Sequence, residues 1–113
     1  MHELSLALEV IELVQREAVK NNVTTVAELQ IEVGDLSGVE ADAFHSALEM
    51  LVRDTILANA GIEMIRTPGR GKCHACDSEF VMTHRLDTCP ECSSFPSEIS
   101  GGVEFRVVSM KGE

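Results

Sequence analysis

The sequence predicts a mixed α/β fold of the α+β type, with two helices packed on a small three-stranded sheet and a cysteine-rich segment inserted before the last strand. Three observations predict it. Apolar residues recur at steps of three and four near the start of the chain, and they alternate with polar residues in later segments. All four cysteines fall between residues 73 and 92, so the chain of 113 residues suits one compact domain with a small appendage.

Residues 4–20 have the periodicity of an amphipathic helix, which we expect to end at Asn21-Asn22. Glu12 and Arg16 stand four apart in the order that mildly favours a helix. The core-facing stripe of this helix is predicted to consist of Leu4, Ala7, Leu8, Ile11, Val14 and Ala18.

Residues 26–33 switch to the alternation of a strand with one solvent-exposed face. Its apolar positions are Leu29, Ile31 and Val33. Residues 34–38 contain two glycines, Asp35 and Ser37, so we expect the strand to end in a turn there.

A second helix is predicted for residues 40–57. The acidic Glu40 and Asp42 lie at its start, where the helix dipole favours negative charge. Short strands are predicted at residues 62–66 and 103–107, and the last one is expected to pair in the same sheet as the first. The core side of the second helix is predicted to carry Phe44, Ala47, Leu48, Leu51 and Thr55.

A Pro- and Gly-containing cluster at residues 67–71 and the Ser-Gly-Gly of residues 100–102 mark the ends of the insertion. We therefore predict an α/β domain formed by residues 1–68 and 101–113, and a small separate domain at residues 69–100. This insertion has no long apolar stripe, so it is not expected to fold on burial alone. Exchange of the insertion between two chains, through its hinges, would produce a homodimer.

The cysteines form two Cys-x-x-Cys pairs separated by twelve residues, Cys73 with Cys76 and Cys89 with Cys92. Four thiolates at this spacing can occupy the corners of a tetrahedron, and zinc is the usual occupant of such a site. The segment is therefore predicted to be a zinc-ribbon-like four-cysteine domain around structural Zn(II), because four sulfur ligands leave no open position for catalysis. Iron in the same cage, as an electron-transfer site, stays open as an alternative.

Composition argues against several function classes. Nine Lys and Arg against nineteen Asp and Glu give a formal charge of −10, which repels nucleic acid and anionic membranes. There is no Trp or Tyr, and no apolar run approaches the roughly 20 residues that cross a bilayer. The start lacks a secretory leader, so we expect a cytoplasmic protein, and no nucleophile–base pair or phosphate-binding motif suggests an enzyme.

The amino terminus can chelate a metal ion. The α-amine of Met1, the amide nitrogen and imidazole of His2, and the amide nitrogen of Glu3 can close fused rings around one ion. Such a nitrogen-rich, near-planar set suits Ni(II) or Cu(II). Glu40 and Asp42 are candidates for an axial ligand by their position at the start of the second helix.

Three features occur together: the opening Met1-His2-Glu3-Leu4-Ser5, the segment Gly34-Asp35-Leu36-Ser37-Gly38-Val39-Glu40 and the paired cysteines. In this combination the chain resembles, over essentially its whole length, the HypA/HybF family of nickel metallochaperones for maturation of [NiFe]-hydrogenase. The resemblance implies a nickel-binding α/β domain and a zinc domain. It implies a carrier without catalytic turnover that works with the GTPase HypB. Delivery would be to the hydrogenase large subunit and, in some bacteria, to urease maturation proteins.

The resemblance also assigns site residues. It implies nickel binding through His2 and through the backbone nitrogen of Glu3 at the amino terminus. Glu40 stands where some members place an aspartate near the nickel. The zinc ligands carry over to Cys73, Cys76, Cys89 and Cys92.

Two hypotheses accompany this interpretation. The alternative function is a zinc-ribbon adaptor for protein interaction or nucleic-acid binding, with no role for nickel. Residues 69–100 hold three Lys and Arg against five Asp and Glu, so they lack the basic surface that nucleic acid would require. The second hypothesis is that the zinc domain responds to the nickel state, because it joins the sheet at both of its ends.

Overall fold

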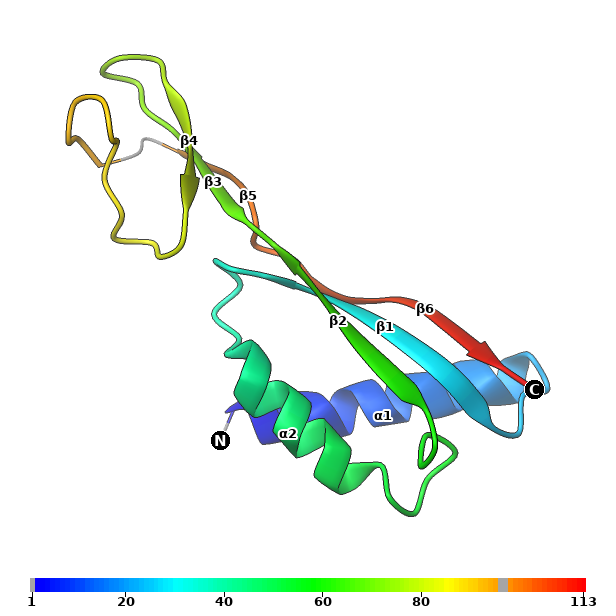
Figure 1. The fold of residues 1–113 in the computed structure, drawn as a ribbon. Coiled ribbons are helices and arrows are strands. Elements are labelled where there is room, and N and C mark those ends of the chain that lie inside the picture. Colours follow the sequence, from blue (N-terminus) through cyan, green and yellow to red (C-terminus); the bar gives the residue numbers. More distant parts are fainter. Residues whose placement is uncertain (1, 96–97) are drawn as a thin grey trace.

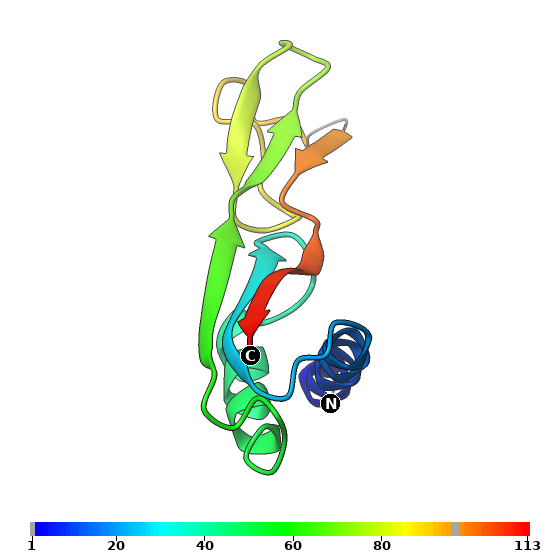
Figure 2. The ribbon, with the colours of Figure 1, turned by 90° about the vertical axis from the view of Figure 1, so that its right-hand side faces the viewer.

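The computed structural model describes residues 2–95 and 98–113, which form two helices and two three-stranded sheets (Figure 1). The molecule is elongated, 53 × 26 × 18 Å, with one sheet at each end of its long axis (Figure 2). The helices are α1 (His2–Lys20) and α2 (Ala41–Leu51). The strands are β1 (Val26–Gly34), β2 (Gly61–Thr67), β3 (Gly69–Lys72), β4 (Glu79–Met82), β5 (Glu98–Gly101) and β6 (Phe105–Gly112).

The first sheet has the strand order β2-β1-β6. β1 pairs in parallel with β2 through a crossover that contains α2, and β6 returns to pair antiparallel with β1. The predicted mixed fold is thus confirmed, including the return of the last strand to this sheet. That strand begins at Phe105, however, and Val103, which we expected inside it, is 45% exposed.

Both helices pack on one face of the first sheet. The predicted strand positions Leu29, Ile31 and Val33 are buried, and they share a single apolar core with residues of both helices. Phe44 of α2 packs edge-on against Phe105 of β6, with ring centroids 5.0 Å apart. On its other face β1 carries Glu28, Gln30 and Glu32, so this strand has the one-sided burial that its alternation predicts.

The buried stripe of α1 differs from the predicted one. Ala7, Val10, Ile11, Val14 and Ala18 are buried, whereas Leu4 and Leu8 are 36% and 48% exposed. Both flanks of the helix are apolar, so periodicity alone could not decide which flank faces the sheet. Packing selects the flank of Val10, which joins the core of the first sheet.

α2 is shorter than predicted: it ends at Leu51, and residues 52–59 form turns and a bend instead of a helix reaching residue 57. The hydroxyl of Thr55 donates to the carbonyl of Val52 at 2.8 Å and accepts from the N–H of Leu57 at 3.1 Å. This side chain therefore competes with the helical hydrogen bonds. The turns still bury Leu57 in the core.

The second sheet, in the order β4-β3-β5, is antiparallel and forms a small module with the cysteines. Its core consists of Leu36, Cys73, Phe80, Met82 and Cys89. Four of these residues lie within the inserted segment, and Leu36 comes from the loop between β1 and α2. Within the described residues, neither helix is long and apolar enough to span a membrane.

Candidate metal sites

The four cysteines converge at one end of the molecule. Their sulfur atoms all lie within 4.8 Å of one another, with Cys73 to Cys92 and Cys76 to Cys89 at 3.5 Å. All four thiols are free. Tetrahedral ligands about 2.3 Å from a zinc ion are about 3.8 Å apart, so these sulfur positions fit a four-thiolate metal site. It is the one such cluster of metal-ligating side chains among the described residues.

Each Cys-x-x-Cys pair is folded by the same tight turn. The residue after the second cysteine has a positive φ, 63° at Asp77 and 62° at Ser93. The N–H of Cys73 then donates to the carbonyl of Ser78 at 2.9 Å, and the N–H of Cys89 donates to that of Ser94 at 2.8 Å. Each turn thereby brings the two sulfur atoms of its Cys-x-x-Cys pair into the four-cysteine cluster.

The surroundings prepare the thiols unequally for a cation. Hydrogen bonds from the hydroxyl and the backbone N–H of Ser94 lower the pKa of Cys92 to about 6, and those of Ser78 lower the pKa of Cys76. Burial raises the pKa of Cys89 to about 11. Hydrogen bonding therefore favours the thiolate at the two exposed cysteines, Cys76 and Cys92, whereas burial favours the protonated thiol at Cys89.

Two serines that hydrogen-bond to the cysteines, Ser78 and Ser94, were not predicted from the sequence. Sγ of Cys76 lies 3.3 Å from Oγ of Ser78, and Ser94 occupies the equivalent position after Cys92. The repeated pattern Cys-x-x-Cys-x-Ser was a usable signal, because it occurs in both pairs.

The second candidate site is the start of α1, in the helix-bearing part of the molecule. Met1 lies outside the described residues; His2 is exposed, and its Nδ1 is 3.9 Å from Oε2 of Glu3. Because the first four N–H groups of a helix have no intrahelical partner, the amide nitrogens of His2 and Glu3 are not used by the helix itself.

The start of α1 is fastened to the start of α2. Oε2 of Glu3 accepts a hydrogen bond from the N–H of Glu40 at 3.3 Å, and this bond is the main reason that the pKa of Glu3 lies below its usual value. The carboxylate of Glu40 instead accepts from the N–H of Ala43 at 2.7 Å and caps α2. The structure thus brings Glu40 beside Glu3 through its backbone.

Two other histidines lie outside both sites. His84 is exposed in a loop held by Asp87, whose Oδ2 accepts from the N–H groups of Thr83 at 2.8 Å and of His84 at 3.3 Å. His45 lies 3.4 Å from Glu49, four residues further along α2.

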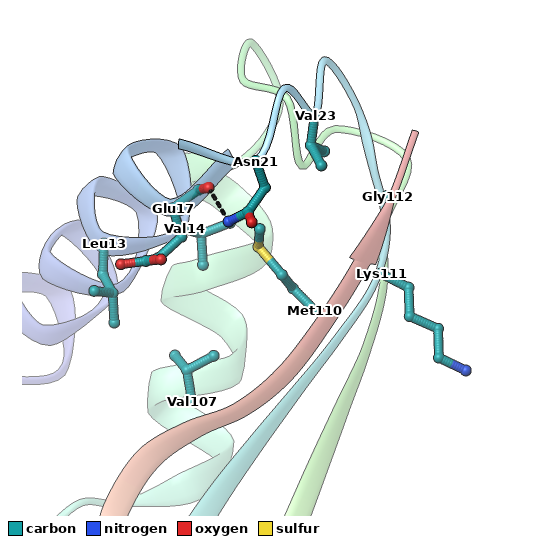
Figure 3. A pocket seen from close by; sticks show the side chains of 9 residues that line it. All are labelled: Leu13, Val14, Glu17, Asn21, Val23, Val107, Met110, Lys111 and Gly112. Atoms are coloured by element: carbon teal, nitrogen blue, oxygen red, sulfur yellow. Dashed lines mark hydrogen bonds between the residues drawn. The ribbon is translucent and has the colours of Figure 1, made fainter. Parts of the chain in front are cut away.

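A hollow of about 710 Å³ lies between the end of α1 and β6 (Figure 3). Its walls include the apolar Leu13, Val107 and Met110, and at its rim the side-chain amide of Asn21 donates to the carbonyl of Glu17 at 2.7 Å. It contains no histidine or cysteine, so its lining does not provide the ligands of a transition-metal site.

Comparison with known proteins agrees with this arrangement. The family model described as "Hydrogenase/urease nickel incorporation, metallochaperone, hypA" matches residues 1–112. A hydrogenase maturation factor HypA of Geobacter metallireducens is 37% identical over 113 residues, which is all of both chains. That of Alkalilimnicola ehrlichii is 32% identical over 111 residues, 98% of both chains.

Solved structures show the same fold. The solution structure of the Ni metallochaperone HypA from Helicobacter pylori superposes with a TM-score of 0.66 at 22% identity, covering 97% of this chain and 96% of that one. A second solution structure, of a HypA protein, has a TM-score of 0.65 at 24% identity and covers 100% and 97%. None of these comparisons supports a zinc-ribbon adaptor without a nickel role.

Proposed function

The chain belongs to the HypA family, the nickel-incorporation metallochaperones of hydrogenase maturation, and from this premise we propose that it holds Ni(II) at its amino terminus and transfers it to a client. The observation that supports this site is the exposed His2 at the start of α1, beside a Glu3 that is already held by Glu40. The four-cysteine site is then a separate structural centre.

The proposed nickel ligands are the α-amine of Met1, the imidazole and amide nitrogen of His2, and the amide nitrogen of Glu3. Nitrogen donors in a near-planar set are those that Ni(II) prefers. An ion held by so few residues at an exposed chain end can pass to a tighter acceptor by ligand exchange. The role is therefore that of a carrier rather than an enzyme.

Glu40 is retained as a candidate axial ligand. Its backbone lies beside Glu3, and one oxygen of its carboxylate, Oε2, accepts from the N–H of Ala43. A metal ligand at this position would therefore be a residue that also caps α2.

The four-cysteine site is proposed to hold Zn(II) permanently. Four sulfur donors within 4.8 Å match a closed tetrahedral site. Zinc supplies on the order of 10–16 kcal/mol to the folding of small zinc-finger peptides. The five-residue core of this module makes such a contribution necessary.

We further propose the division into a nickel-binding domain, residues 1–68 and 101–113, and a zinc-binding domain, residues 69–100. The existence of two separate sheets and two apolar cores supports it.

As partners we propose the GTPase HypB and the [NiFe]-hydrogenase large subunit, with urease maturation proteins as further clients. The family description, which names hydrogenase and urease, supports the client classes. A cytoplasmic location is supported by the four free thiols, because cysteines stay reduced in the cytosol.

The deciding experiment titrates Ni(II) into three zinc-replete proteins: the native chain, His2→Ala, and a variant with residues added before Met1. Both changes remove donors, so both should abolish tight nickel binding, and zinc content should stay unchanged. Native nickel binding in both altered proteins would refute the amino-terminal site. Acid should release nickel from the native protein, because protons compete with the metal ion for its nitrogen donors.

A further inference from the structure

The loop between β1 and α2, residues 35–40, contacts both metal-binding regions. At its first end Leu36 is 2% exposed and lies in the core of the cysteine module with Cys73 and Cys89. At its other end Glu40 contacts the start of α1. One short segment therefore joins the two regions by direct packing and hydrogen bonding.

The anchoring of Leu36 is specific. The guanidinium of Arg85, 49 residues further along the chain, donates from Nη2 to the carbonyl of Leu36 at 2.8 Å. The N–H of Leu36 donates to the carbonyl of Gly102 at 2.8 Å. A Cβ added at Gly69 would lie 2.5 Å from Cγ of Leu36, so the side chain fits closely against the backbone of β3. Both backbone polar groups and the side chain of Leu36 are thus fixed by the module or its hinges.

The rest of the loop is short and contains a hydrogen bond of its own. The N–H of Val39 donates to Oγ of Ser37 at 3.2 Å, which holds the turn that follows Leu36. Glu40 is four residues from Leu36, and four residues span at most about 14 Å. Its N–H then donates to Oε2 of Glu3 at 3.3 Å. Leu36 and the residue that holds Glu3 are thus joined by a short segment with a hydrogen bond of its own.

We propose that Leu36 and Arg85 are positioning residues for nickel binding: by anchoring residues 35–40 in the cysteine module, they hold the first turn of α1 in the conformation that binds the ion. The inference rests on the proposed amino-terminal nickel site. Neither residue contacts the ion. They restrict the conformations of the chain end before it binds the metal, so less conformational entropy is lost on binding and the affinity is higher.

The test compares nickel affinity, zinc content and the amide resonance of Glu40 in zinc-loaded proteins. The variants are Arg85→Ala, which removes the hydrogen bond to Leu36, and Arg85→Lys, which keeps one donor. Leu36→Val trims the buried side chain by one methylene and provides a milder second route. Arg53→Ala is the matched control, since Arg53 is an exposed arginine outside the loop and its loss changes the net charge equally.

We expect Arg85→Ala and Leu36→Val to keep their zinc, shift the Glu40 amide resonance and weaken nickel binding about three- to tenfold. Arg85→Lys should recover most of that loss, and Arg53→Ala should behave as the native protein. Native nickel affinity in Arg85→Ala and Leu36→Val would overturn the proposal, as would an equal loss in Arg53→Ala. His2→Ala distinguishes a failure of the amino-terminal nickel site from a failure of the positioning role. If His2→Ala leaves nickel affinity unchanged, the amino-terminal site is wrong. If His2→Ala loses nickel affinity but Arg85→Ala does not, only the positioning role is wrong.

Discussion

The backbone N–H of Glu40 donates to the carboxylate of Glu3 at 3.3 Å, which joins the first turns of two helices that are 37 residues apart in the sequence. The bond uses the backbone of Glu40, so the carboxylate of the same residue is free to cap α2 at 2.7 Å from the N–H of Ala43. Glu40 therefore contacts the start of α1 with its backbone and caps α2 with its side chain. Substitutions of the side chain test only the cap.

Glu40→Ala should lower the free energy of unfolding by about 0.5–1 kcal/mol, because it removes the cap of α2 but leaves the backbone bond to Glu3 in place. Glu40→Asp keeps a capping carboxylate and should be close to native. Urea denaturation of both variants measures the difference. Nickel titration of the same pair addresses the ligand role: an axial carboxylate predicts a loss of affinity in Glu40→Ala, and equal affinity in both variants and the native chain would leave Glu40 as a cap only.

Gly69→Ala should destabilise the protein by about 1–3 kcal/mol, since the added Cβ would lie 2.5 Å from Cγ of Leu36 and 2.6 Å from the carbonyl oxygen of Met82. Gly61→Ala is the matched control at the start of β2, where the nearest atom is 3.8 Å away. Thermal unfolding of the two variants should therefore diverge, with a clear fall in Tm for Gly69→Ala and a change near zero for Gly61→Ala. Equal Tm values would show that Leu36 and the backbone of Met82 shift to accommodate the added Cβ at little cost in stability.

Most of the first sheet could be predicted from the sequence because its signals are local. The alternation around Leu29 and Ile31 identifies a strand with one buried face, and that face is observed. The cysteine spacing identifies the four-thiolate cluster in the same way. In both cases the residues that define the feature are neighbours in the sequence or repeat at a fixed interval.

The features that could not be predicted depend on contacts distant in the sequence. The choice of Val10 rather than Leu8 as the buried flank of α1 is made by the sheet, not by the helix. Leu36 looks like an ordinary turn residue in the sequence, yet it lies in the core of the cysteine module because Gly69 leaves room for it. The bond between Glu3 and Glu40 likewise exists only after both helices have packed.

Removal of the proposed zinc ion should unfold the cysteine module while the first sheet persists. The module has a core of five residues, two of which are Cys73 and Cys89, whereas the first sheet has its own larger core. Hydrogen exchange with and without a strong chelator should show lost protection in β3, β4 and β5, and retained protection in β1. Uniform loss of protection would instead mean that the two sheets unfold as a single unit.

Ser94→Ala should make zinc binding more sensitive to acid. The hydroxyl of Ser94 is the largest cause that lowers the pKa of Cys92, to about 6, so its removal raises that pKa. Zinc binds the deprotonated thiol, so protons compete with zinc for Cys92 once the pH falls below the pKa of this thiol. If that pKa is higher, the competition begins at a higher pH. The pH at half release of zinc, followed with a chromogenic chelator, should therefore rise in Ser94→Ala. Ser100→Ala, an exposed serine on β5, is the control and should titrate as the native protein. An unchanged midpoint in Ser94→Ala would mean that the backbone N–H of residue 94 alone stabilises the thiolate.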